Sequence, residues 1–182
     1  NHVLNQPRAA PVYSAYTGSQ FSNDEIEVVL KSQGIKYRKL EDEELFEVVT
    51  NKLMEPGVVG WFSGRAEFGP RALGGRSILA DPRNAEAKNL LNLKIKRRES
   101  FRPFAPSILK EYSGEYFMRD DEVPFMEKVF LIKPEKHSLI PAVTHVDGTG
   151  RLQTVDKNVS PRYYGLIESF RKKTGVPVLL NT

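Results

Sequence analysis

The fold is decided by residues 58–80, which read VVGWFSGRAEFGPRALGGRSILA. The stretch begins with an apolar run, residues 58–62, that is bounded by glycines and is typical of a buried strand. It ends with a second strand candidate, residues 77–80. Between the two strands lies a loop with three arginines and four glycines. We therefore predict a strand, an anion-binding loop and a second strand.

The loop, residues 64–76, has a composition that suits phosphate. Glycine permits close approach of the backbone, and guanidinium groups bind phosphate in a bidentate manner. Arg71 is the main candidate for an anion contact, and Arg65 and Arg76 are secondary candidates. Glu67 could pre-orient one of these arginines. The alternative is a surface turn held by Arg–Glu pairs, and the loop is no Walker loop because it lacks the Lys-Ser/Thr pair.

Outside this stretch, strands and helices alternate along the chain. A capping box of Ser22 and Glu25 starts a helix that ends at Gly34. Periodicity predicts further helices over residues 43–55, 85–96 and 163–173, and strands over residues 129–132, 139–146, 152–155 and 176–180. This alternation favours an α/β (α+β) fold, a twisted mixed sheet with helices packed on it.

The first twenty residues differ from the rest of the chain. Residues 1–20 mix Pro, Ala, Tyr and Gly without a period, so we interpret them as an extended arm or an interdomain linker with no core of its own. The folded domain is then expected to be residues 21–182. The first residue is Asn1, and we interpret the chain as a fragment of a longer polypeptide.

Composition narrows the class of protein. A chain of 182 residues with 40% hydrophobic residues can bury a core. No run of about 18 apolar residues is present, so we expect a soluble, cytoplasmic protein with no membrane span. The absence of cysteine excludes disulfides, thiolate metal sites and a cysteine nucleophile. A net charge of +4 is too small to indicate nucleic-acid binding by itself.

A second basic cluster, residues 94–106, follows the predicted helix 85–96. Lys96, Arg98 and Arg102 alternate there with Phe101, Pro103 and Phe104. Cations at a helix C-terminus are favoured by the helix dipole, so a structural basic cap is one interpretation. The other is a rigid phosphate site, because apolar neighbours would anchor the turn that carries the cations.

His145 lies where a predicted strand runs into a glycine turn. It could donate a hydrogen bond to a carbamoyl or phosphate group, or it could only tie down the turn through Asp147 or Thr149. The chain has 3 histidines, without the spacing of a metal site. We therefore expect no zinc or iron ligands in this chain.

Four ordered stretches resemble one protein family. They are GWFSGRAEFGPRALGGRSILADPR, NLKIKRRESFRPFAPSIL, PAVTHVDGTGRLQTV and TGVPVLLNT, which together lie within residues 60–182. They are similar to the C-terminal, YrdC-like domain of the NodU/CmcH carbamoyltransferases. Members of that family usually continue after Leu-Leu-Asn-Thr with Ser-Phe-Asn, so we expect the domain to be cut short at Thr182.

The resemblance implies a function for the chain. The YrdC-like domain would form carbamoyl-adenylate from ATP, with Mg²⁺, and carbamoyl phosphate. A missing N-terminal ATPase-like domain, with iron or another metal, would then transfer the carbamoyl group to a small-molecule hydroxyl acceptor. The residues implied as substrate contacts are Arg71, Lys96, Arg98, Arg102, Arg151 and Asn181, with His145 as a candidate; Lys96 and Arg102 would act in catalysis.

A binding module is the alternative to an enzyme. The same fold could use its cationic concavity for RNA or another phosphorylated ligand without catalysis, although nucleic acid is the less favoured partner. Strong salt dependence and binding of long polymers would support RNA, whereas saturable nucleotide binding at modest salt would support the enzyme.

Overall fold

The structure is a computed structural model that describes residues 14–182. It contains a six-stranded sheet in the order β1-β2-β6-β3-β5-β4. The mixed sheet with helices packed on it confirms the predicted fold class, whereas the strand order was not predicted. The strands are β1 (Val59–Phe62), β2 (Arg76–Ala80), β3 (Ala105–Leu109), β4 (Lys128–Leu131), β5 (Thr149–Val155) and β6 (Val178–Asn181). The α-helices are α1 (Asn23–Ser32), α2 (Asp42–Met54), α3 (Glu86–Leu90), α4 (Ser113–Tyr116) and α5 (Pro161–Thr174).

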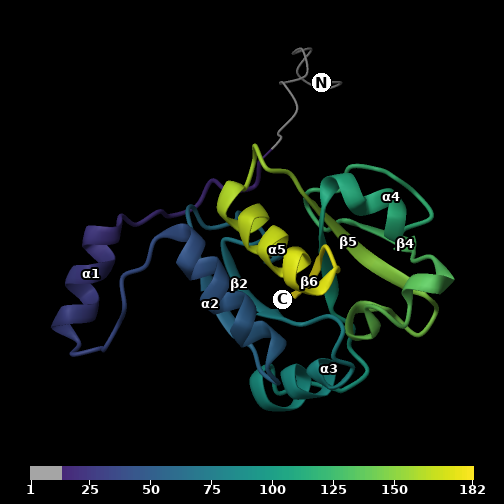
Figure 1. The fold of residues 1–182 in the computed structure, drawn as a ribbon, viewed down its shortest axis with the longest axis horizontal. Coiled ribbons are helices and arrows are strands. Elements are labelled where there is room, and N and C mark those ends of the chain that lie inside the picture. Colours follow the sequence, from purple (N-terminus) through teal and green to yellow (C-terminus); the bar gives the residue numbers. More distant parts are fainter. Residues whose placement is uncertain (1–13) are drawn as a thin grey trace, which may run out of the picture.

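The two long helices α2 and α5 contact each other and lie side by side over the sheet (Figure 1). Leu166, Ile167 and Phe170 form a fully buried face of α5. Leu53 of α2 is fully buried as well. The two central strands β3 and β6 are buried along their whole length. The core therefore lies between these strands and the two helices.

Strand pairing places the arginine loop at one end of a hairpin. β1 and β2 are antiparallel, with Val59 opposite Leu79 and Phe62 opposite Arg76. The Ser63 amide donates to the Gly75 carbonyl at 2.9 Å and closes the loop between them. β2 pairs next with β6, where Asn181 lies opposite Leu79. The loop is thereby brought beside the last residues of the chain.

Most predicted elements are confirmed, and two regions differ. The strand predicted over 139–146 is wrong: Pro141 begins a short 3₁₀ turn, Pro141–Val143, because proline presets φ for a helical turn and removes a ladder donor. Conversely, β3 was not predicted, because Pro106 in the sequence indicates a turn and proline is rare in central strands. Its pairing with β5 starts at Ser107, so the missing amide of Pro106 precedes that ladder.

Two predicted helices are confirmed with altered packing or geometry. The helix predicted over 85–96 divides into α3 and a π-helical segment, Leu91–Ile95. α1 has the predicted capping box of Ser22 and Glu25, but none of its residues is buried. It projects from the body of the molecule (Figure 1). Its apolar residues therefore do not join the core, as the exposures of Val28 (67%) and Val29 (57%) show.

Part of the expected arm lies against the arginine loop. The Gly18 amide donates to the Ala66 carbonyl at 2.9 Å, and the Ala66 amide donates to the Ser19 carbonyl at 2.8 Å. The Phe68 amide donates to the Ala15 carbonyl at 2.7 Å. Residues 1–13 of that arm lie outside the described residues. Among residues 14–182, no helix is both long and apolar enough to cross a membrane.

Candidate anion-binding site

A pocket of about 550 Å³ opens between the arginine loop, the basic turn after the π-helical segment and the ends of β5 and β6. We call it the cationic pocket. Five positively charged side chains line it: Arg71, Arg76, Lys96, Arg98 and Arg151. None of its lining residues in the described part of the chain is Asp or Glu. The pocket is therefore built to attract an anion.

Mutual repulsion and burial shape the electrostatics of these cations. Burial, and then the nearby Arg98, lower the pKa of Lys96. Burial lowers the pKa of Arg151, with smaller effects from Arg71 and Arg98. Arg71 and Lys96 are exposed and the other three cations are half-buried. Like charges this close together repel one another, and a bound anion would offset that repulsion. The pKa shifts therefore agree with the lining of the pocket.

Three side chains of this pocket have buried polar atoms that lack a hydrogen-bond partner among the described residues. They are Arg151 Nε and Asn181 Oδ1, and the pocket residue Trp61 adds its indole Nε1. A buried polar atom without a partner costs about 1–3 kcal/mol, so folded proteins rarely retain one without a reason.

A buried asparagine organises the basic turn. Asn92 is fully buried, and its Nδ2 donates to the Ser100 carbonyl at 3.2 Å and to the Arg102 carbonyl at 3.0 Å. Its Oδ1 accepts from Arg98 Nε at 2.8 Å. The Arg98 guanidinium also lies 4.8 Å from the centre of the buried Phe104 ring. Buried contacts therefore hold the turn. Phe104 anchors it as we expected, whereas Phe101 is 75% exposed and does not.

Three backbone amides of the arginine loop, residues 64–76, donate to a carboxylate and are therefore not free to bind a ligand. Glu67 accepts from the amides of Leu73 (2.7 Å), Gly75 (2.7 Å) and Arg76 (3.1 Å). We expected Glu67 to orient an arginine and the loop amides to face the anion. In the structure these three amides are already bonded, so the loop can offer its arginine side chains.

Two glycines make this compact loop possible. Gly74 has φ of +104°, and a Cβ there would come within 2.2 Å of the Tyr163 ring. A Cβ on Gly75 would come within 2.6 Å of the Arg65 carbonyl oxygen. Only glycine fits either position without displacing its neighbours.

The secondary candidates Arg76 and Arg65 bind the protein itself. Arg76 Nη1 donates to the carbonyls of Ser63 and Gly75, and its Nη2 donates to those of Ser19 and Gly64. Its guanidinium lies 3.5 Å from the centre of the Phe62 ring. Arg65 Nη1 donates to the Gly18 carbonyl at 3.2 Å. Arg65 is not a lining residue, and Arg76 shapes the pocket wall.

Two further candidates lie outside the lining of the cationic pocket. Arg102 forms an exposed ion pair with Glu99 at 2.8 Å. His145 Nδ1 lies 2.9 Å from Thr149 Oγ1, which itself donates to Asp147 at 2.7 Å. Because the Thr149 hydroxyl hydrogen points to Asp147, His145 donates from Nδ1. His145 thus ties down its turn, and burial lowers its pKa.

Asn181 is fixed by a buried polar network that the sequence did not reveal. Its Nδ2 contacts the Ala72 carbonyl (3.0 Å), Ser107 Oγ (3.1 Å) and Gln153 Oε1 (3.0 Å). Gln153 is 2% exposed and Ser107 is fully buried. The only signal in the sequence is a polar side chain within an apolar strand. That signal does not tell which backbone groups the side chain bonds.

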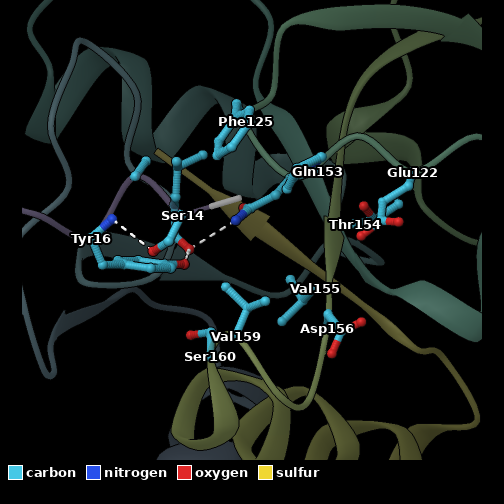
Figure 2. Close-up of a pocket in the computed structure, with 13 residues that line it drawn as sticks. Ser14, Tyr16, Glu122, Phe125, Gln153, Thr154, Val155, Asp156, Val159 and Ser160 are labelled. Carbon is cyan, nitrogen blue, oxygen red and sulfur yellow. Dashed lines mark hydrogen bonds between the residues drawn. The ribbon is translucent and has the colours of Figure 1, made fainter. Parts of the chain in front are cut away.

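A second cavity, of about 350 Å³, is lined by Gln153 of this network and by Tyr16 (Figure 2). Figure 2 shows Tyr16 and Gln153 pointing toward the same part of the wall. Val155, Asp156 and Ser160 form part of the lining. Leu73 and Gln153 belong to this cavity, whereas Ala72 and Asn181 belong to the cationic pocket. The network therefore forms a partition between the two spaces.

Known proteins have sequences similar to that of this chain. A family model described as Carbamoyltransferase C-terminus matches residues 50–182. An uncharacterized protein of Synechocystis sp. is 46% identical over 190 residues, covering 92% of this chain and 31% of the relative. Nodulation protein NolNO of Sinorhizobium fredii is 54% identical over 71% of this chain and 20% of the relative.

A relative named for its activity is 3'-hydroxymethylcephem-O-carbamoyltransferase of Amycolatopsis lactamdurans, which is 39% identical over 93% of this chain and 31% of the relative. The chain thus spans between a fifth and a third of the length of these three relatives. The family match covers both sides of the cationic pocket, from β1 to Thr182. The chain belongs to the carbamoyltransferase C-terminal domain family.

Proposed function

We propose that the cationic pocket binds the phosphates of ATP and of carbamoyl phosphate, and that the chain forms carbamoyl-adenylate there. The observation that carries this proposal is the pocket lining, with five cations and no carboxylate among its described residues. The family membership adds the carbamoyl group, because a relative is named for carbamoyl transfer. Transfer to a hydroxyl acceptor would then belong to the part of the longer relatives that this chain does not match.

The chemistry needs electrostatic stabilisation and no protein nucleophile. Carbamoyl phosphate would lose its phosphoryl group to water and leave carbamate. A carbamate oxygen would then attack the α-phosphorus of ATP, and the bond to the leaving pyrophosphate would break. Lys96, Arg71 and Arg151 would stabilise the charge that develops on the phosphoryl and pyrophosphate oxygens.

Magnesium would enter as a complex with the nucleotide. Within residues 14–182, no group of three or more His, Asp or Glu side chains is placed to hold a metal ion. Mg²⁺ is commonly held by one or two carboxylates together with substrate phosphates and water, so phosphate oxygens can supply most of its ligands. The residues of the pocket would contact those phosphates rather than the ion.

Calorimetric titration with ATP and Mg²⁺, with and without carbamoyl phosphate, tests the proposal. Charge-assisted hydrogen bonds contribute about 1.5–3 kcal/mol each, so Lys96→Ala/Arg151→Ala is expected to weaken nucleotide binding by at least about a hundredfold. The matched control is Arg38→Ala/Lys172→Ala, which removes two exposed cations away from the pocket. Equal binding by both double variants, each folded by circular dichroism, would refute the proposed site.

Titrations with nucleotide and with long RNA, each repeated at several salt concentrations, distinguish an enzyme from the RNA-binding alternative. An enzyme site is expected to saturate with one nucleotide and to keep its affinity at moderate salt. If long RNA bound instead, with affinity falling steeply as salt rises, the cationic pocket would be part of a nucleic-acid surface.

A further inference from the structure

We infer that Tyr16 and Gln153 are positioning residues for the cationic pocket, because together they hold the backbone that follows Arg71. The role at the pocket rests on the proposed function, since it concerns how well the pocket is shaped for phosphate. Neither residue lies in the loop it would hold, and Tyr16 precedes the region that the family match covers. The inference therefore makes the segment before α1 part of the site.

The two side chains meet at one backbone oxygen. The Tyr16 hydroxyl donates to the Leu73 carbonyl at 2.7 Å, and Gln153 Nε2 donates to the same oxygen at 2.8 Å. A carbonyl oxygen has two lone pairs and can only accept, so both are used and the orientation of the Gln153 amide is fixed. Burial raises the pKa of Tyr16 to about 12, so its hydroxyl stays a donor at neutral pH.

The fixed amide of Gln153 then orients Asn181. With Nε2 committed to Leu73, Gln153 Oε1 accepts from Ser107 Oγ at 2.5 Å and from Asn181 Nδ2 at 3.0 Å. Asn181 Nδ2 reaches the Ala72 carbonyl at 3.0 Å. The two carbonyls that directly follow Arg71 are thus both held by side chains from the sheet and the arm.

The opposite edge of the same segment is held as well. The Leu73 amide donates to Glu67 at 2.7 Å, while its carbonyl receives Tyr16 and Gln153. A backbone held on both edges has few alternative conformations. The position of Arg71 at the pocket therefore depends on contacts with the far side of the partition, where Tyr16 lines the second cavity.

The test compares Tyr16→Phe with Tyr37→Phe. Each change removes one tyrosine hydroxyl and keeps the ring, but the Tyr37 hydroxyl donates to Glu27 at 2.8 Å on the exposed side of α1. Gln153→Glu is the second variant, because it preserves shape and replaces the donor to Leu73 with an acceptor. Tyr16→Phe keeps the test decisive if the buried Gln153→Glu fails to fold.

Hydrogen exchange of residues 69–76 is the first measurement, made without ligand. We expect Tyr16→Phe to speed exchange of these amides by roughly threefold to tenfold, the effect of one lost hydrogen bond, and Tyr37→Phe to leave them unchanged. A pyrophosphate titration is the second, and its affinity is expected to fall by a similar factor in Tyr16→Phe alone. Because the two donors share one oxygen, the effects of Tyr16→Phe and Gln153→Glu are expected to be non-additive.

The outcomes separate the two proposals. Exchange that is equal in Tyr16→Phe, Tyr37→Phe and the unmodified chain would overturn the positioning role. Faster exchange with unchanged pyrophosphate affinity would also overturn it. Failure of the unmodified chain to bind pyrophosphate would count against the proposed function, while the exchange rates would still decide whether Tyr16 holds the loop.

Discussion

At the scale of single residues, the proposed anion site rests on the side chains that line the cationic pocket. Arg151 has a buried Nε with no partner in the described residues, and the lining contains no carboxylate. Positive charges without a counter-charge cost free energy in the unliganded protein, and a phosphate would offset that cost. The charge of the lining therefore supports the proposed phosphate site.

The lowered pKa of Lys96 predicts how anion binding depends on pH. Burial places this pKa below the ordinary lysine value of 10.5 in the free protein, and a bound anion would raise it again. The affinity for pyrophosphate is therefore expected to be full at neutral pH and to fall as pH rises through the free-state pKa, before an ordinary lysine would lose its proton.

Lys96→Arg provides the control for this pH dependence, because a guanidinium stays charged throughout the range. Its pyrophosphate affinity, measured by titration at a series of alkaline pH values, is expected to decline less than that of the unmodified chain. Identical pH profiles for the two proteins would show that Lys96 does not contact the anion.

At the scale of elements, the hairpin β1–β2 and its loop form a unit whose shape depends on glycine. The sequence was sufficient to predict both strands and the loop, because an apolar run, a glycine-rich stretch and a second apolar run succeed one another. It could not reveal that Glu67 binds the loop amides, because a carboxylate next to arginines suggests an ion pair.

Gly74→Ala is expected to destabilise the fold. The new methyl group would overlap the buried Tyr163 ring, and φ of +104° is unfavourable for alanine. Overpacking costs about 1–3 kcal/mol and backbone strain of this kind costs a similar amount, so a loss of about 2 kcal/mol or more is expected in urea unfolding.

Gly57→Ala is the matched control, because a Cβ there meets nothing within 4 Å. Its free energy of unfolding is expected to stay within about 0.5 kcal/mol of the parent value, as is usual at open surface positions. Equal stability of the two alanine variants would mean that the loop does not pack against Tyr163 as described.

At the scale of the whole molecule, the sequence was sufficient to predict a mixed sheet and most of the helices and strands. It also indicated the charged candidate residues, but not which of them lie together in the folded protein. Arg71, Lys96, Arg98 and Arg151 meet in one pocket, whereas Arg102 does not line it. Charge and spacing do not tell which cations converge, since convergence depends on the strand order. The buried polar network was missed for the same reason.

The packing of the helices predicts unequal contributions to stability. Leu53 of α2 is fully buried, so Leu53→Ala is expected to cost about 2–5 kcal/mol in urea unfolding. Val28 of α1 is 67% exposed, so Val28→Ala is expected to change stability by about 0.5 kcal/mol or less. A large loss from Val28→Ala would show that α1 belongs to the cooperative core.

A crystal structure of the chain with a non-hydrolysable ATP analogue and Mg²⁺ would test the central claim most directly. We predict that the phosphates lie in the cationic pocket and accept hydrogen bonds from Arg151 and Lys96. A nucleotide ordered in the second cavity beside Tyr16, or elsewhere without contact to Arg151 and Lys96, would contradict the account.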